Sequence, residues 1–150
     1  MNLWILRHGE AQNQAHNDAA RELTPRGRLE VQRSAVHLGD QPLDAILVSP
    51  YVRAQQTAAV INAAVGPKPL FTVPWLTPES DPAEVLRQLD SLHYRDLLLV
   101  SHQPLVGVLI GLLQHGHMRQ PESMGTASLA QLEGDFALAG LMSLRQLRHA

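Results

Sequence analysis

Residues 3–10 of this 150-residue chain read Leu3-Trp4-Ile5-Leu6-Arg7-His8-Gly9-Glu10. Four consecutive apolar residues that end at a charged one are typical of a short buried strand. A glycine directly after His8 permits an unusual turn or a close approach of another backbone segment. The stretch therefore predicts a buried strand whose carboxyl end presents a guanidinium and an imidazole.

Short apolar runs recur along the chain and predict further strands. They lie at residues 44–48, 70–73 and 97–100. The last third of the chain allows two interpretations. Residues 127–132 and 137–147 predict either two strands, joined through Glu133-Gly134-Asp135, or a terminal helix.

Helical patterns lie between the predicted strands. Three of them begin with a capping residue before a proline, which is typical of a helix start: Thr24-Pro25, Ser49-Pro50 and Asp81-Pro82. The helix that Ser49-Pro50 opens is expected to run to Gly66. A fourth helix, at residues 105–113, is apolar on all sides and is therefore expected to be buried.

The alternation of strands and helices indicates an α/β fold with a largely parallel sheet. We expect a single domain over residues 1–150, built as a three-layer sandwich with about four helices flanking a mostly parallel central sheet. In such folds, chemistry gathers at the carboxyl ends of the strands. Those strand ends are where candidate site residues should lie.

The composition excludes several classes of function. The chain has 12 basic and 14 acidic residues, a formal charge of −2, which argues against nucleic-acid or anionic-membrane binding. It has no cysteine, which excludes disulfides and cysteine-nucleophile phosphatases. Its single lysine, Lys68, lies outside any glycine-rich loop, so a Walker-type nucleotide site is excluded. No metal or cofactor motif is present.

The start of the chain shows no basic segment followed by an apolar one, so no secretory signal is apparent. Its longest apolar stretch, residues 97–113, is interrupted by Ser101-His102-Gln103-Pro104, which makes it a poor membrane span. We therefore expect a cytoplasmic protein.

Arginine and histidine follow three of the predicted strands: Arg7 and His8, Arg53, and His102. Converging at one sheet edge, two guanidiniums and two imidazoles would form an anion pocket suited to a phosphoryl group. Neighbouring arginines disfavour the protonated form of an imidazole and keep its lone pair available. Without cysteine, histidine is the best candidate nucleophile.

Arg7-His8-Gly9-Glu10 resembles the signature of the histidine phosphatase superfamily, also called the phosphoglycerate mutase-like superfamily, and Arg53 and His102 match its second arginine and second histidine. The short chain, with no room for the extra helical insertion of larger members, is similar to the SixA-type phosphohistidine phosphatases. Four motifs fit that subgroup: Leu23-Thr24-x-x-Gly27, Leu47-Val48-Ser49-Pro50, Leu76-Thr77-Pro78 and Val100-Ser101-His102-x-Pro104-Leu105-Val106-Gly107.

The resemblance implies a metal-independent phosphatase without a cofactor. His8 would be the nucleophile, while Arg7, Arg53 and His102 would hold the phosphoryl oxygens, with His102 protonated in the phosphate complex. The implied substrate is phosphohistidine on a protein, such as a histidine phosphotransfer domain or a phosphocarrier protein, and inorganic phosphate is the product. Two alternatives remain: a small-molecule phosphomonoesterase of the same superfamily, and a non-catalytic phosphoprotein-binding module.

A general acid is the feature that separates the two enzymatic alternatives. Ester substrates leave as poor alkoxides and need a proton donor, for which Glu79 and Asp81 are the nearest candidates. Asp81 is also expected to cap a helix. Among the other polar residues, Asp18 and Arg21 are expected to form a loop ion pair near the site, and Ser49 a helix cap.

Overall fold

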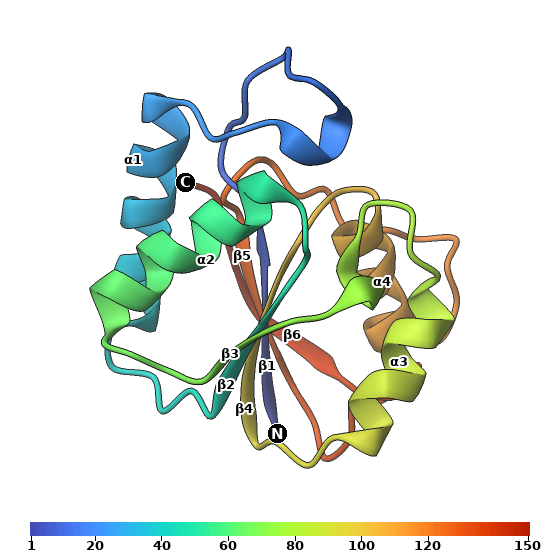
Figure 1. Ribbon diagram of the computed structural model, residues 1–150. Helices are drawn as coiled ribbons and strands as arrows, with labels where there is room; N and C mark the ends of the chain where they lie inside the picture. Colours follow the sequence, from blue (N-terminus) through green and yellow to red (C-terminus); the bar gives the residue numbers. More distant parts are fainter.

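The computed structural model describes residues 1–150 as a six-stranded sheet with helices on both faces (Figure 1). The strands are β1 (Asn2–Arg7), β2 (Ala45–Val48), β3 (Leu70–Thr72), β4 (Asp96–Ser101), β5 (Leu129–Glu133) and β6 (Ser143–Arg148). The α-helices are α1 (Pro25–Ala35), α2 (Val52–Val65), α3 (Pro82–Ser91) and α4 (Leu105–His115). Three short 3-10 helices complete the elements: η1 (Asp18–Ala20), η2 (Val36–Leu38) and η3 (Pro74–Leu76). The predicted three-layer α/β architecture is confirmed.

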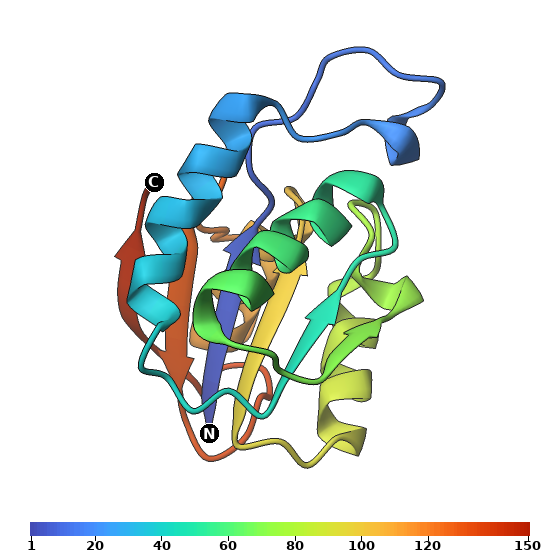
Figure 2. The same ribbon diagram turned by 60° about the vertical axis from the view of Figure 1, so that its left-hand side comes forward.

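The order of the strands is β3-β2-β4-β1-β5-β6. The first four are parallel, so their carboxyl ends meet at one edge, whereas β5 and β6 are antiparallel additions beyond β1. Figure 2 shows the loop between β1 and α1 arching over that edge. No helix in the fold is both long and apolar enough to cross a membrane.

Two apolar cores lie on opposite faces of the sheet. Because side chains alternate along a strand, Leu3 and Ile5 pack into one core with α3 and α4, whereas Trp4 and Leu6 pack into the other with α1 and α2. Both faces of β1 and β4 are thus buried, which explains why their sequences are continuous apolar runs instead of alternating ones.

Two of the three predicted helix starts are confirmed. Thr24 accepts a hydrogen bond from the Gly27 N–H, and Asp81 accepts one from the Ala83 N–H. The third is wrong, because α2 begins at Val52 and its N-cap is Tyr51, without a side-chain cap. Ser49 and Pro50 lie in the turn before that helix, and the Ser49 hydroxyl is engaged elsewhere.

The last third contains two strands, so the alternative of a terminal helix is wrong. The predicted second strand, at residues 137–147, begins too early, since β6 starts at Ser143. The segment before it turns at Gly140, whose φ of 73° is left-handed and whose N–H donates to the Leu112 carbonyl oxygen at 3.0 Å. This backbone contact with α4 keeps the segment out of the sheet.

Candidate active site

The backbone of His8 is fixed from both sides at the carboxyl edge of the sheet. Arg7 pairs with Ser101 at the ends of β1 and β4, and the next N–H, that of His8, donates to the Ser101 carbonyl oxygen at 3.0 Å. On the other side, the His8 carbonyl oxygen accepts from the Ala127 N–H at 2.9 Å. His102 follows Ser101 directly, so the two histidines emerge from adjacent strands.

The turn after His8 brings two backbone segments into close contact. A Cβ atom on Gly9 would collide with the Gly27 carbonyl oxygen, and one on Gly27 would collide with the Glu10 carbonyl oxygen. The Gly9 N–H also donates to Thr57 Oγ1 at 3.1 Å. The predicted close backbone approach after His8 is therefore confirmed.

His8 is 5% exposed, and its hydrogen bonds define its tautomer. Nδ1 lies 2.7 Å from the Gly9 carbonyl oxygen. Because a carbonyl oxygen only accepts, Nδ1 carries the proton and Nε2 keeps the lone pair. Arg53 Nε donates to that Nε2 at 3.2 Å.

Burial and charge together keep the His8 ring neutral. Its pKa is lowered to about 4, mainly by burial and further by the positive charges of Arg53, Arg7 and Arg21, while the hydrogen bond to Gly9 acts in the opposite direction. The prediction that arginines favour the neutral ring is confirmed, although burial is the larger cause. At neutral pH, His8 presents an available nitrogen lone pair.

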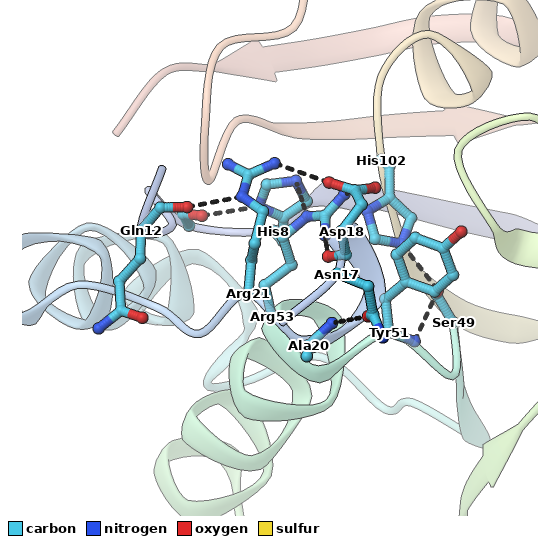
Figure 3. A network of polar contacts seen from close by, with 11 residues as sticks. His8, Gln12, Asn17, Asp18, Ala20, Arg21, Ser49, Tyr51, Arg53 and His102 are labelled. Carbon is cyan, nitrogen blue, oxygen red and sulfur yellow. Dashed lines mark hydrogen bonds and ion pairs between the residues drawn. The ribbon is translucent and has the colours of Figure 1, made fainter. Parts of the chain in front are cut away.

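Arg53 lies in the first turn of α2 and reaches back over the strand ends, with 4% of its surface exposed (Figure 3). Beyond its contact with His8, Nη1 donates to the Asp18 carbonyl oxygen at 2.7 Å and Nη2 to an Asp18 carboxylate oxygen at 3.3 Å. The guanidinium carbon also lies 5.2 Å from the centre of the Tyr51 ring. One arginine therefore links the nucleophile candidate to the loop above it.

His102 is almost fully buried, at 1% exposed. Its Nε2 lies 2.7 Å from Ser49 Oγ, and its Nδ1 has no hydrogen-bond partner. The centre of its ring is 5.1 Å from that of His8. The pKa of His102 is lowered to about 2, first by burial and then by His8, Arg53 and Arg7, with Asp18 opposing them.

Arg7 completes the cationic wall of the site. Its Nη1 donates to the Met124 carbonyl oxygen at 2.9 Å, and its buried Nε has no partner. The pKa of Arg7 is lowered by burial and by Arg53, against an opposing effect of Glu30. Arg7 is thus charged, half-buried and within electrostatic reach of both Arg53 and His8.

The two acid candidates do not join this cluster. The Asp81 side chain is exposed and accepts from the Ala83 N–H at 2.9 Å, in its predicted capping role. Glu79 is exposed and makes no hydrogen bond or ion pair with any of the four cluster residues. His115 and His117 stack on each other, and no three His, Asp or Glu side chains gather as a metal site would require.

Three further residues support the cluster without having been predicted to do so. Asp18 forms the expected ion pair with Arg21 at 2.9 Å, but it also holds Arg53. Ser49 contacts His102. Glu30, on α1, accepts from the Glu10 N–H at 2.8 Å and from the Thr126 hydroxyl at 3.0 Å, which ties the loop before β5 to the turn after β1. Ser49 lies in the Leu47-Val48-Ser49-Pro50 motif, but no local pattern predicts its partner or those of Asp18 and Glu30.

Comparisons with known proteins agree on one family. Residues 3–77 match the histidine phosphatase superfamily (branch 1). The chain is 40% identical over 149 residues to the phosphohistidine phosphatase SixA homolog of Haemophilus influenzae, covering 90% of this chain and 89% of that protein. It is 33% identical over 141 residues to phosphohistidine phosphatase SixA of Escherichia coli, covering 90% and 86%.

Solved structures extend the similarity to nearly the whole chain. The protein histidine phosphatase SixA complexed with tungstate superposes with a TM-score of 0.90 at 31% identity, over 99% of this chain and 97% of that one. A putative alpha-ribazole-5'-P phosphatase from Escherichia coli has a TM-score of 0.78 at 21% identity, over 99% and 96%, which shows a shared fold.

Proposed function

This chain belongs to the histidine phosphatase superfamily, and from that premise we propose that it hydrolyses the P–N bond of phosphohistidine on a protein, with His8 as the nucleophile. Its relatives in Haemophilus influenzae and Escherichia coli, which match 90% of this chain, are named as a phosphohistidine phosphatase SixA homolog and as phosphohistidine phosphatase SixA. The proposed partners are cytoplasmic proteins phosphorylated on histidine, namely histidine phosphotransfer domains or phosphocarrier proteins.

The first step transfers the phosphoryl group to His8. The Nε2 lone pair attacks phosphorus, while the P–N bond of the substrate breaks and its electron pair returns to the substrate nitrogen. With a proton on its other nitrogen, the substrate imidazole leaves as a neutral ring. His8 keeps the proton on Nδ1, and this N–H donates a hydrogen bond to the Gly9 carbonyl oxygen. That hydrogen bond stabilises the positive charge that develops on the phosphorylated ring.

The second step transfers the phosphoryl group from His8 to water. A water molecule attacks phosphorus, the bond to Nε2 breaks, and its electron pair returns to His8. The proton that water loses stays with the released phosphate or the solvent. The enzyme returns to its starting state, and inorganic phosphate leaves.

The observation that carries this proposal is a pair of buried nitrogens without partners, Arg7 Nε and His102 Nδ1. A buried polar group left unpaired costs about 1–3 kcal/mol. Phosphoryl oxygens would satisfy both nitrogens, and Arg53 would supply further N–H groups from the same side. The tungstate complex of the similar SixA structure supports an oxyanion site in this fold, because tungstate is a tetrahedral oxyanion.

The position of the carboxylates favours a P–N substrate over an ester. Glu79 and Asp81 are exposed, and Asp81 is engaged at the start of α3. An alkoxide needs a proton donor to leave, whereas imidazole, with an unperturbed pKa of about 6.5, leaves without strong acid assistance. Asp18, the one carboxyl in contact with Arg53, has a lowered pKa because of its hydrogen bond from Arg21 and is therefore a weak proton donor. A site with two arginines and no protonated carboxylic acid suits phosphohistidine.

The test compares phosphate release from a histidine-phosphorylated phosphocarrier protein with release from p-nitrophenyl phosphate. We expect fast release from the carrier and weak release from the ester, and neither activity in His8→Ala. Glu79→Gln and Asp81→Asn should leave carrier hydrolysis within about twofold of the unmodified protein, since asparagine also caps helices well. Strong ester turnover that collapses in either amide variant, with an untouched carrier, would show a phosphomonoesterase instead.

A further inference from the structure

Ser49 makes the one hydrogen bond to the His102 ring, and the pair is sealed from solvent. Ser49 follows β2 and is 0% exposed, and His102 follows β4 and is 1% exposed. Ser49 Oγ lies 2.7 Å from His102 Nε2 and accepts from the Tyr51 N–H at 3.2 Å. Figure 3 shows the Ser49 hydroxyl between the His102 ring and the Tyr51 backbone, with a dashed line to each.

These contacts determine where the protons lie. A hydroxyl has one proton and two lone pairs, and the Tyr51 N–H already donates to Ser49 Oγ. If His102 Nε2 also donated to that oxygen, the hydroxyl proton would be buried without an acceptor. The arrangement that leaves the fewest groups unpaired has the Ser49 hydroxyl donating to a lone pair on Nε2, so that Nδ1 of His102 is the one group without a partner until a phosphoryl oxygen binds. The single proton of a neutral His102 then lies on Nδ1.

The surroundings of His102 favour the neutral ring. His8, Arg53 and Arg7 all oppose a positive charge there, and Asp18 is the one acidic side chain that favours it. The Tyr51 ring packs edge-on against the imidazole, with centres 5.1 Å apart. A protonated His102 would place a third positive charge beside the buried guanidinium of Arg53 and the half-buried one of Arg7.

We infer that Ser49 is a positioning residue that holds His102 as a neutral imidazole, with Nδ1–H as a donor to a phosphoryl oxygen. The inference rests on the proposed function for the identity of that acceptor. It differs from the expectation of a protonated His102, because the ring can donate without a net charge. His8 and His102 then share one tautomer, imposed by a carbonyl on His8 and by a hydroxyl on His102.

The first test needs no activity. Nitrogen chemical shifts of isotope-labelled histidine in the unliganded protein should show a proton-bearing Nδ1 and a bare Nε2 at His102 at about pH 7. In Ser49→Ala the proton of His102 should no longer prefer Nδ1. His8 serves as the internal control, because its hydrogen bond to the Gly9 carbonyl oxygen should keep its proton on Nδ1. A proton on Nε2, or on both nitrogens, in the unmodified protein would overturn the inference.

The second test measures the effect on turnover of phosphorylated carrier protein. Ser49→Ala should lower kcat/KM roughly tenfold to hundredfold, the effect expected when His102 no longer holds Nδ1–H as a donor to the charged phosphoryl oxygen. Ser49→Thr keeps the hydroxyl and should restore most of that loss. Equal losses in both variants, with equal thermal stability, would contradict the role of the hydroxyl.

The two proposals fail in different ways. If the unmodified protein does not hydrolyse the carrier, the proposed function fails while the tautomer of His102 is still measurable. If the carrier is hydrolysed and the Nδ1 proton is absent, only the role of Ser49 is overturned.

Discussion

The site has two halves that are built differently. The strand-end half comprises Arg7, His8, Ser49 and His102, which follow or end adjacent parallel strands, and its histidines and serine are at most 5% exposed. The loop half comprises Asp18 and Arg21, whose side chains are 56% and 28% exposed. The strand-end half is held by sheet hydrogen bonds, whereas the loop half is held by side-chain contacts that water can replace.

Arg53 joins the two halves, and its contacts show what each half does. Its Nε faces His8, while its terminal nitrogens are engaged by the Asp18 carbonyl and carboxylate oxygens. A phosphoryl group would compete with Asp18 for those nitrogens. The strand ends therefore supply a fixed site for the chemistry, and the loop supplies exchangeable partners. Three predictions test this difference.

The largest expected effect is on stability in mild acid. His8 and His102 have folded pKa values of about 4 and about 2, below the ordinary value near 6.5. Below about pH 6.5 the unfolded chain binds protons that the folded chain does not, so the free energy of unfolding falls as the pH falls. Between about pH 6.5 and about pH 4 the expected loss is about 3 kcal/mol for each histidine.

Asp18 should respond in a different range. The pKa of its carboxyl is lowered, mainly by the hydrogen bond from Arg21, so its contribution is present above the ordinary carboxyl pKa and is lost only below it. Urea unfolding at a series of pH values separates the two ranges. In His102→Asn the free energy of unfolding should change less steeply with pH above about pH 4. A free energy of unfolding that stays constant from about pH 7 to about pH 4 would show that the strand-end histidines are not buried as neutral rings.

The next effect concerns the rigidity of the turn after His8. Gly27→Ala places a Cβ against the Glu10 carbonyl oxygen. Replacing glycine by alanine in a helix normally raises the free energy of unfolding. Here the collision with backbone should outweigh that gain and lower the free energy of unfolding by about 2 kcal/mol. Thermal or urea unfolding measures the change.

Gly39→Ala is the matched control. A Cβ there would have the Val36 carbonyl oxygen as its nearest neighbour, at 3.7 Å, and the φ of Gly39 is −57°. This substitution should stabilise the protein by about 0.4–1 kcal/mol. Equal stabilities for the two variants would mean that the turn after His8 is no more tightly packed than the surface around Gly39.

The smallest effect concerns the loop half. Asp18→Asn removes a negative charge beside Arg53 while keeping the backbone carbonyl contact. Inorganic phosphate should then inhibit more strongly, by at most about fivefold, because the carboxylate is exposed and its attraction is screened by solvent. Inhibition constants for phosphate test this. Weaker inhibition would show that Asp18 orients Arg53 for phosphate more than it competes with it.

The contrast between the two halves also explains what sequence could predict. Continuous apolar runs ending at Arg7 and Ser101 mark the buried parallel strands, and parallel strands bring their ends together. The α/β architecture and the gathering of Arg7, His8, Arg53 and His102 at one edge follow from those runs. Thr24 and Asp81 cap their helices because capping is local.

The supporting contacts join residues that lie far apart in the sequence, so local patterns do not predict them. Ser49 and His102 are 53 residues apart, Asp18 and Arg53 are 35 apart, and Glu30 and Thr126 are 96 apart. Ser49-Pro50 has the local pattern of a helix start, so the wrong prediction there is the expected result of a tertiary contact overriding a local preference. The prediction for the start of β6 was wrong for the same reason, since the residues around Gly140 carry no sign of its hydrogen bond to the distant Leu112.

The central claim is that the strand end at β1 presents His8 Nε2 as the nucleophile. It is tested most directly by mixing the protein with excess radiolabelled phosphocarrier protein, quenching with alkali during turnover, and mapping the labelled enzyme peptide by mass spectrometry. We predict label on His8, attached at Nε2, and none in His8→Ala. Label on His102, or phosphate release without any labelled enzyme, would contradict the account.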